Sequence, residues 1–588
     1  MSYSTYIVGI DLGTTNCAVA WVKPGEGEPE RDDFPVSQLV GPGQLEKRPT
    51  LPSFLYIPGH EMSQDSLQLP WDEVATFAVG TFARDEGGKV PHRLISSAKS
   101  WLSQEGVDRR SAILPWKAQD VQQMSPVQAS ASYLKHLRDA WRFAYPDEPM
   151  KEQEVVLTVP ASFDAVAREL TAEAARVADL PNLTLLEEPQ AAFYAWLDGA
   201  GDGWREKIGV GDLILVCDIG GGTTDFSLIT VVDQEGDLGL ERVAVGEHLL
   251  LGGDNMDLAL AVAVQNRLRQ EGTKIDSWQF QVLTHGCRAA KEALLGSQPP
   301  QEVAITIPGR GSKLVGGAVQ AELKLADVEA LLDGFFPRVE ASDHAQRKRH
   351  GGLTEIGLPY ESDPAVTRQL ARFLDGKQPT AVLFNGGVLK AAMVRQRIVD
   401  VLDSWLDKPV RLLEGGDLEL AVARGAARYG LSRRGVGIRI RGGLSKTYYI
   451  GVELARPAVP GMPPPIKAVC VAPRGMEEGT RTDVPEQKFG LVVGESVEFP
   501  FLASTEREDA PGTTLEDWED EVEQISTVAV SLKPEKGREA GVVPVKLESV
   551  VTEVGTLELW CHEADGEGRW KLEFEVRDQD APQAEPVP

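Results

Sequence analysis

The sequence predicts an α/β protein with a smaller all-β domain after it. Three observations carry this prediction: a strand–turn–strand motif that occurs twice, an alternation of β-rich and amphipathic helical stretches from Tyr6 to about Leu431, and segments of period two beyond that point. Single hydrophobic cores stop growing near roughly 250–300 residues. A chain of 588 residues is therefore expected to form at least two domains.

The composition is that of an ordinary globular protein, with 42% hydrophobic and 25% charged residues. A net charge of −29 opposes general affinity for nucleic acid or anionic membranes. The N-terminus has no basic segment, and no apolar run approaches the ~18 residues that span a bilayer, so we expect a cytoplasmic protein. The cysteines are scattered without a CxxC pair, which favours buried thiols over disulfides or a zinc site. They are Cys17, Cys217, Cys287, Cys470 and Cys561.

The repeated motif joins an apolar strand, an aspartate, a glycine turn, a threonine pair and a second strand. Its first copy is YIVGIDLGTTNCAVAWV (6–22), and its second is LILVCDIGGGTTDFSLITV (213–231). In each copy, backbone N–H groups and hydroxyls can approach a phosphate while the aspartate holds a cation such as Mg²⁺. We expect the threonines of the two copies to occupy matching positions. Two copies predict two lobes that grip one nucleotide.

The residues of these hairpins are the first candidates for a binding site. In the first copy they are Asp11, Gly13, Thr14, Thr15 and Asn16; in the second they are Asp218, Gly220, Gly221, Gly222, Thr223, Thr224 and Asp225. The chain contains no GxxxxGK[ST] sequence, which excludes the ordinary P-loop mechanism.

A pair of glutamates lies between the hairpins, in LLEEPQAAFYAWL (185–197). Glu187 or Glu188 could orient an attacking water for phosphoryl transfer. The same residues, followed by Pro189, also fit a helix N-terminus with proline in its first turn. The residues alone leave both interpretations open.

Two further junctions place a helix N-terminus beside a strand end, where ligands commonly bind. A strand at 154–160 precedes a helix from Asp164 to Leu180, and a strand at 380–387 opens into the helical sequence VLKAAMVRQRIVDVL. Gly386 and Gly387 at the second junction allow a close backbone approach.

The pattern changes after Leu431. Residues 433–445 are rich in Gly and Arg and are expected to be a linker; residues 446–578 alternate at period two and predict the all-β domain; the acidic, Pro-rich tail 579–588 is expected to be disordered. The basic run Arg347, Lys348, Arg349 and His350 predicts a surface loop in 343–352. The acidic stretch 505–524 around Trp518 predicts a flexible loop, with partner docking as the alternative.

Eight segments together resemble a known family. VGIDLGTTN, VLTVPASF, LEEPQAA, DIGGGTTD, LGGDNMD, CRAAKEAL, FNGGVLK and AVARGAA occur in the order and spacing of the ATPase domain of DnaK-type (70-kDa heat-shock) chaperones, within the actin, hexokinase and heat-shock superfamily. The resemblance covers roughly residues 5–431 and implies a two-lobed, actin-like ATPase domain over 1–432. The β-rich region resembles a divergent chaperone substrate-binding β-domain, and the family's α-helical lid is absent.

The resemblance also implies roles for individual residues. Asp11 and Asp218 match the aspartates that hold Mg²⁺ through water, Glu188 the catalytic-water glutamate, and Thr223 the threonine at the γ-phosphate. Arg84, in VGTFAR, is placed where the family has a catalytic lysine, which predicts slow turnover because a planar fork replaces a compact charge. Nucleotide binding is implied for the hairpin glycines and threonines with Asn16 and for Gly252, Gly253, Lys291, Gly386, Gly387 and Lys390.

Several positions depart from the family pattern. Arg288 and Glu292 carry charges opposite to the usual ones, and Val388 and Lys390 replace a small polar residue and an arginine, so the preference for adenine is open. Ser162 replaces a tyrosine in the motif after VPA, although Arg168 matches. Thr184 stands where an arginine used in J-domain docking is expected, and the basic stretch from Arg433 replaces an acidic-leucine linker. Both J-domain stimulation and the usual coupling to the β-domain are therefore in question.

The resemblance leads to a leading hypothesis and its alternatives. We expect a chaperone ATPase that uses ATP and Mg²⁺ to control binding of an unfolded or dedicated client, with a co-chaperone or separately encoded partner as a further candidate. The main alternative is an ATP-gated scaffold with little turnover that holds one partner. A small-molecule kinase or an actin-like filament former is favoured less, because the β-rich domain has no place in either.

Overall fold

The computed structural model describes residues 4–575, except for the segments given at the end of this paragraph. The predicted tail 579–588, the basic run 347–350 and most of the predicted linker lie outside the described residues. The chain divides into two compact units, one of residues 1–231 and 245–439 and the other of residues 232–244 and 440–588. The segments not described are 26–27, 105, 119, 235–236, 297, 310–317, 347–356, 437–443, 445, 455–464, 477–478, 486–487, 505–506, 517, 520, 532–540, 553–555 and 567.

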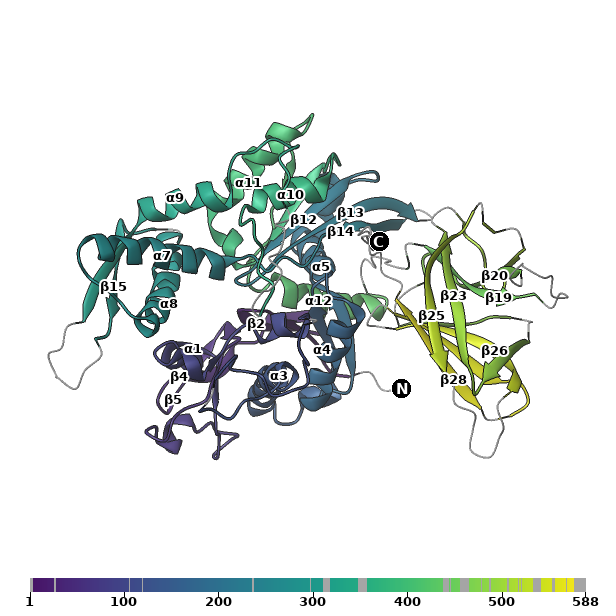
Figure 1. Cartoon of the computed structure of the whole chain (residues 1–588), viewed down its shortest axis with the longest axis horizontal. Helices are drawn as coiled ribbons and strands as arrows, with labels where there is room; N and C mark the ends of the chain where they lie inside the picture. The colour runs from purple at the N-terminus through teal and green to yellow at the C-terminus, as the bar shows by residue number, and fades with distance from the viewer. Residues whose placement is uncertain are drawn as a thin grey trace, which may run out of the picture. The chain divides into compact units, whose positions relative to one another are not determined.

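The first unit contains two sheets with the same local plan (Figure 1). In each, a central strand pairs antiparallel with the next strand of its hairpin and parallel with a strand that arrives much later in the chain. The central strands are buried on both faces, which explains their continuous apolar runs. We call the part built on the first sheet lobe I and the part built on the second lobe II.

The order of lobe I is β11-β10-β1-β2-β3 with β6 beside β2, and that of lobe II is β14-β13-β12-β17-β18. The lobe I strands are β1 (Ile7–Leu12), β2 (Asn16–Lys23), β3 (Glu30–Asp33), β6 (Thr50–Pro52), β10 (Glu154–Val159) and β11 (Leu183–Glu187). The lobe II strands are β12 (Leu213–Ile219), β13 (Thr224–Gln234), β14 (Asp237–Val245), β17 (Ala381–Asn385) and β18 (Arg411–Leu413).

Two helices of lobe I begin at side-chain caps. Ser125 forms a capping box with Gln128 at the start of α3 (Pro126–Ala144), and Asp164 accepts a hydrogen bond from the Ala167 amide at the start of α4 (Ala165–Val177). The predicted helix from Asp164 is confirmed, although it ends three residues before Leu180.

The chain returns to lobe I at its last helix. The helix α12 (Ala421–Arg433) packs on β1, β10 and α5 (Glu188–Ala200), so residues far apart in sequence build one lobe. Arg433 donates to Thr184, and Arg434 pairs with Glu154 at 2.9 Å. The first two residues of the predicted linker therefore belong to the end of this helix.

Each lobe carries a smaller part with its own core. In lobe I this part contains β4 (Val36–Gly41), β5 (Gln44–Arg48), β7 (Leu55–Tyr56), β8 (Ala78–Val79), β9 (Leu94–Ile95), α1 (Thr81–Gly87) and α2 (Ala98–Leu102). In lobe II it contains α7 (Gly253–Gln270), α8 (Ser277–Leu294), β15 (Glu302–Ile307), β16 (Val319–Lys324) and α9 (Leu325–Phe335). Further helices of this unit are α6 (Trp204–Lys207), α10 (Val366–Leu374) and α11 (Ala392–Trp405), the last preceded by a 3-10 turn at Gly387–Lys390.

The described residues after 445 form strands and loops, in two sheets that share one core. One sheet has the order β24-β20-β19-β23-β25, and the other the order β21-β26-β27-β28 with β22 beside β26. The strands are β19 (Thr447–Glu453), β20 (Ile466–Ala472), β21 (Arg481–Asp483), β22 (Phe489–Val493), β23 (Ser496–Ser504), β24 (Thr514–Leu515), β25 (Glu523–Ser531), β26 (Gly541–Val551), β27 (Thr556–Glu563) and β28 (Arg569–Glu575).

The acidic stretch around Trp518 differs from its expectation as a flexible loop. Trp518 is only 8% exposed and packs with Val522 against Tyr449 and Cys470, on the face of β19 and β20 that points away from the shared core. Its indole N–H donates to the Ile466 carbonyl at 3.1 Å. Arg507 binds Asp509 and Glu521, so part of the acidic charge is paired within the stretch itself.

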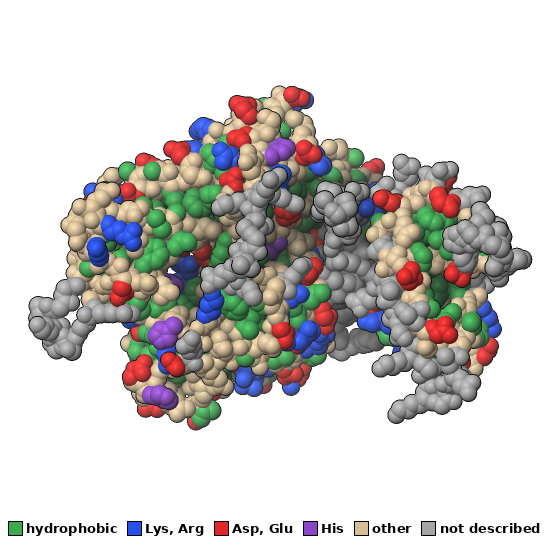
Figure 2. Space-filling model, viewed as in Figure 1, with side chains coloured by type: hydrophobic (Ala, Val, Ile, Leu, Met, Phe, Trp, Pro, Cys, Tyr) green, Lys and Arg blue, Asp and Glu red, His purple; other side chains and the backbone are tan. Residues whose placement is uncertain are grey.

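All five cysteines are buried and free, as the sequence predicts. Among the described residues, no helix has both the length and the apolar character that crossing a membrane requires. On the face drawn in Figure 2, acidic and basic side chains are interspersed over the described surface.

Candidate functional site: a cleft built on two hairpins

A cavity of about 1100 Å³ opens between the two lobes of the first unit. Most of the predicted site residues line it. They are Asp11, Gly13, Thr14, Thr15, Asn16, Arg84, Glu188, Asp218, Gly220, Gly221, Thr223, Gly253, Lys291, Gly386, Gly387 and Lys390. Gly222, Thr224 and Gly252 lie behind this lining: the Thr224 hydroxyl donates to the Leu251 carbonyl at 2.7 Å and so fixes the turn before α7.

The strand register corrects the expected match between the threonines. Asp11 pairs with Ala18 and Asp218 with Asp225, so the two hairpins have the same length and can be superposed residue by residue. Thr14 and Thr15 then correspond to Gly221 and Gly222, whereas Thr223 corresponds to Asn16. The sequence places similar residues in both turns but not at equivalent positions.

This mismatch lets the two turns approach each other. A Cβ on Gly221 would overlap the Thr15 side chain, and a Cβ on Gly222 would lie 2.6 Å from the Thr14 methyl group. The threonines of one turn therefore occupy the space that the glycines of the other leave free. The Thr15 hydroxyl is buried and has no hydrogen-bond partner within the described part of the chain, which leaves it available to a ligand.

Each aspartate receives a hydrogen bond from the equivalent position of the neighbouring parallel strand. Thr158 on β10 donates to Asp11 at 3.3 Å, and Asn385 on β17 donates to Asp218 at 2.6 Å. Neither donor was identified from the sequence, although Asn385 is the one strongly polar residue in the strand AVLFN.

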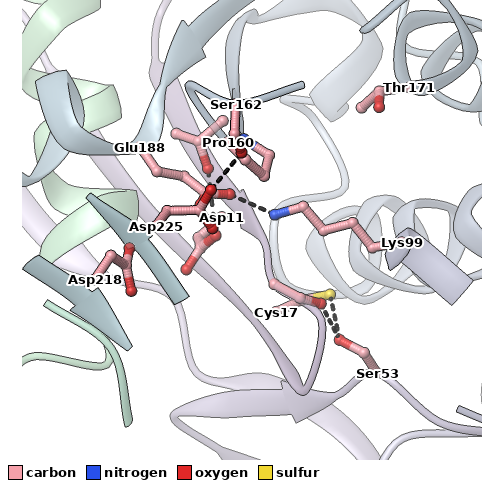
Figure 3. A network of polar contacts seen from close by, with 12 residues as sticks. Asp11, Cys17, Ser53, Lys99, Pro160, Ser162, Thr171, Glu188, Asp218 and Asp225 are labelled. Atoms are coloured by element: carbon pink, nitrogen blue, oxygen red, sulfur yellow. Dashed lines mark hydrogen bonds and ion pairs between the residues drawn. The ribbon is translucent and has the colours of Figure 1, made fainter. Parts of the chain in front are cut away.

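The cation that lies beside Glu188 is Lys99. The Lys99 ammonium on α2 forms a buried ion pair with Glu188, and the two side chains are 6% and 12% exposed (Figure 3). Arg84 also lines the cavity, but it is 37% exposed and pairs with its neighbour Asp85. The resemblance predicts Arg84 as the catalytic cation, whereas the geometry favours Lys99. Lys99 is the only charged residue in LISSAKSWL (94–102), a signal that the sequence offered.

The electrostatics show a cleft with excess negative charge. Burial and the neighbouring Glu188 raise the pKa of Asp11 to about 7, against the opposing effects of Lys99 and Thr158. Burial and Glu188 also raise the pKa of Asp218 well above its usual range. Burial by itself lowers the pKa of Lys99, but Glu188 and Asp11 hold it above the usual value. Such a cleft favours a bound cation.

The two adjacent glutamates have different roles. Glu187 ends β11 and points into the protein, where it forms a buried ion pair with Arg168 at 3.0 Å. Glu188 begins α5, with Pro189 in the first turn, and faces Lys99 and the cleft. The interpretation as a helix N-terminus is confirmed, and the role of Glu188 in orienting water stays a prediction that its position facing the site allows.

The far end of the cavity is lined by a network of charges on α7 and α8. Lys291 donates to the Gly253 carbonyl at 2.8 Å and pairs with Asp257 at 2.6 Å. Arg288 binds Asp257 and Asp254, and its guanidinium lies over the Phe54 ring of lobe I at 5.4 Å. The reversed charge at Arg288 is therefore balanced within lobe II.

No group of three or more His, Cys, Asp or Glu side chains within the described ranges could enclose a metal ion by itself. The donor set nevertheless fits Mg²⁺, which uses one or two carboxylates and completes its shell with water and substrate phosphates. Asp11 and Asp218, on opposite walls of the cavity, are the residues that would hold it.

The fold and the site together define a class: a two-lobed protein with duplicated phosphate-binding hairpins. Residues 86–346 match the family model described as Hsp70 protein. The chain is 32% identical over 378 residues to the chaperone protein HscA of Enterobacter sp. (strain 638), covering 60% of this chain and 53% of that protein. It is 26% identical over 432 residues to the chaperone protein dnaK of Thalassiosira pseudonana, covering 67% and 64%.

A third similarity, to the chaperone protein HscA homolog of Bordetella pertussis, is 31% over 364 residues and covers 60% of this chain and 49% of that protein. These similarities support an Hsp70-type chaperone family member, with the family-model match confined to residues 86–346. The chain spans about half the length of most of these curated relatives. The family has a two-lobed, actin-like ATPase fold, which agrees with the two sheets of equal plan in the first unit.

Proposed function

We propose that this protein hydrolyses ATP with Mg²⁺ and uses the reaction to control the binding of a protein client. The observation that carries the proposal is the buried Lys99–Glu188 pair, set beside Asp11 in a cavity that both phosphate hairpins line. A positive charge, a carboxylate and two aspartates at one point suit phosphoryl transfer to water, in which catalysis is positioning and charge stabilisation.

The chain's own residues divide the task. Backbone amides and hydroxyls of the two turns, including Thr15 and Thr223, bind the phosphate oxygens. Glu188 orients the attacking water, and Lys99 both holds Glu188 and offsets the negative charge that develops on the transferred group. Asp11 and Asp218 would hold magnesium, which would neutralise part of the phosphate charge. The nucleoside end of the cavity is formed by Lys291, Gly386 and Gly387.

We propose that the second unit binds the client and that its binding responds to the nucleotide in the first unit. Its two sheets enclose a core of their own, as a client-binding module requires. We propose that residues 446–578 are a divergent substrate-binding β-domain and that the client is an unfolded segment or a dedicated partner protein. The names of the curated relatives, which are chaperones, support this proposal. A cytoplasmic location remains a prediction from the sequence.

Single-turnover ATP hydrolysis by Glu188→Gln tests the catalytic assignment. We expect the rate to fall about 10²–10⁴-fold, because the variant cannot orient the water by charge, while binding of a fluorescent ATP analogue stays within about threefold of wild type. The matched control is Glu419→Gln on the same cavity wall, where the half-exposed Lys390 partner predicts only a small change. An unchanged rate in Glu188→Gln would contradict the proposal.

The alternative, an ATP-gated scaffold with little turnover, is favoured by the departures at Ser162 and Thr184. Steady-state hydrolysis with and without an unfolded peptide separates the two functions. Stimulation by peptide supports the chaperone cycle. Stable capture of one partner in ATP, without any stimulation, supports the scaffold.

A further inference from the structure

A serine, an aspartate and a histidine meet where the two lobes touch. Ser162 lies in the loop after β10 of lobe I, Asp225 is on β13 of lobe II, and His248 follows β14 of lobe II. The Ser162 hydroxyl bonds Asp225 and lies 2.9 Å from His248 Nδ1, which is itself 3.2 Å from Asp225 Oδ1. Figure 3 shows Ser162 and Asp225 joined beside Glu188. The cluster thus links the lobes next to the proposed reaction centre.

The geometry determines where the protons are. Both Ser162 and Asp225 approach the same ring nitrogen, Nδ1 of His248. Without a proton on Nδ1, its lone pair would face the carboxylate of Asp225. The proton must therefore be on Nδ1, so that the ring donates to Asp225 while the serine hydroxyl donates to the same carboxylate. A hydrolytic triad requires serine and carboxylate on opposite ring nitrogens, and this arrangement excludes it.

The cluster contacts the proposed reaction centre through Phe163. The edge of this ring meets His248, with ring centroids 5.3 Å apart, and Lys99 Nζ lies 5.9 Å from its centroid. Asp225 is also the direct strand partner of Asp218. A change in how Ser162 and Phe163 sit against lobe II would therefore change the position of Lys99 beside Glu188.

The surroundings of the cluster keep Asp225 ionised. His248 and Asp225 are 13% and 8% exposed. Burial would raise the pKa of Asp225, but His248, Ser162 and Lys99 together hold it below the usual value. The other charged groups nearby are Asp218 on the adjacent strand and Glu247, which pairs with Arg372 of α10. An ionised carboxylate accepts charge-assisted hydrogen bonds, so Asp225 can bind both the His248 ring N–H and the Ser162 hydroxyl.

We propose that Ser162, Asp225 and His248 form a latch between the lobes, in which His248 is a positioning residue that slows nucleotide release and holds Lys99 in place. The latch rests on the proposed ATPase function. It is a property of this chain's own side chains, since Ser162 replaces the family's tyrosine.

The test measures dissociation of a fluorescent ADP and single-turnover hydrolysis in the full-length chain. His248→Ala and Ser162→Ala each remove one side of the latch and are expected to speed ADP release about tenfold, as for a lost hydrogen bond to a charged group. His248→Asn keeps a neutral donor near the position of Nδ1, and Ser162→Thr keeps the hydroxyl, so both should stay within about threefold of wild type at pH 8.

The comparison of His248→Ala with His248→Asn carries the decisive readout, because only His248→Ala removes the donor to Asp225. Rescue by His248→Asn is expected if the latch depends on this hydrogen bond. His285→Ala on α8 is the matched control and should release ADP at the wild-type rate.

Two results would overturn the latch while leaving the ATPase intact: equal release rates for His248→Ala and wild type, or release by His248→Asn that is as fast as release by His248→Ala. A wild-type protein that binds nucleotide but does not hydrolyse it would overturn the proposed function, and the release measurements would still decide the latch. Wild type that binds neither ATP nor ADP would overturn both.

Discussion

The hairpins of lobe I and lobe II place an aspartate at the same point of the same strand pattern, yet their surroundings differ. Asp11 lies beside Lys99, whose partner is Glu188, and it accepts from Thr158. Asp218 accepts from Asn385 and has Asp225 on the paired strand. The position equivalent to Asp225 in lobe I is Ala18, which is buried against α12. The same backbone plan thus lies beside the Lys99–Glu188 ion pair in lobe I. In lobe II it carries Asp225, which binds Ser162 of lobe I.

The comparison also shows how two similar turns can fit together. If both turns carried threonines at the same positions, their side chains would collide where Thr14 and Thr15 meet Gly222 and Gly221. The two turns can therefore face each other across the cleft only because their sequences differ at these positions. Three predictions test the differences between the two lobes, from the largest expected effect to the smallest.

The largest effect is expected for Lys99, the lobe I cation that pairs with Glu188. Lys99→Ala should lower single-turnover ATP hydrolysis by about 10²–10⁴-fold, because Glu188 loses its partner and the reaction loses a nearby positive charge. Arg84→Ala, the control, should change it less than about threefold, since Arg84 is partly exposed and pairs with Asp85. A larger loss for Arg84→Ala would restore the assignment made from sequence.

The equivalent glycines Gly13 and Gly220 should respond differently to the same substitution. A Cβ on Gly13 would overlap the Asn16 carbonyl oxygen, whereas at Gly220 the nearest atom is 3.6 Å away. Gly13→Ala is expected to cost about 1–3 kcal/mol in overpacking and to weaken ADP binding about ten- to hundredfold. Gly220→Ala should bind within about threefold of wild type in the same titration. An equal loss of ADP affinity in Gly13→Ala and Gly220→Ala would contradict the predicted difference between the two turns.

The smallest effect concerns stability without nucleotide or Mg²⁺. Asp11 has a pKa of about 7 in the folded protein, above its usual value, so the folded state binds the proton more tightly than the unfolded state. The contribution of Asp11 to stability should then fall as pH rises from about 4 to 7 and level off above that.

Asp11→Asn removes this contribution. Its thermal midpoint, measured by circular dichroism, should exceed that of wild type by roughly 2–4 °C at pH 8 and by less at pH 5. The control Asp85→Asn should follow wild type at both values. A wild-type midpoint that rises through this window in the absence of cations would contradict the raised pKa.

Local sequence patterns predicted much of the fold. They predicted the strands around Asp11 and Asp218, the helix capped by Asp164 and the change to period two after residue 445. These features depend on periodicity, caps and glycine turns, which involve only neighbouring residues. The hairpins and Gly386–Gly387 were identified for the same reason, whereas Glu188 was distinguished from Glu187 only by the family resemblance. Trp518 was assigned wrongly, since an acidic neighbourhood does not reveal that one aromatic side chain packs on a sheet.

The sequence by itself determined that two aspartate-bearing turns exist and that phosphate chemistry suits them. Only the tertiary structure decided which cation stands beside Glu188, which residues of the two turns are equivalent, and that Ser162 and His248 meet at Asp225. The physical reason is distance along the chain. Lys99 and Glu188 are 89 residues apart and Ser162 and His248 are 86 apart. Only the packing of sheets and helices around the cleft brings such residues together. Periodicity, caps and turn residues describe neighbouring positions and therefore do not predict these long-range contacts.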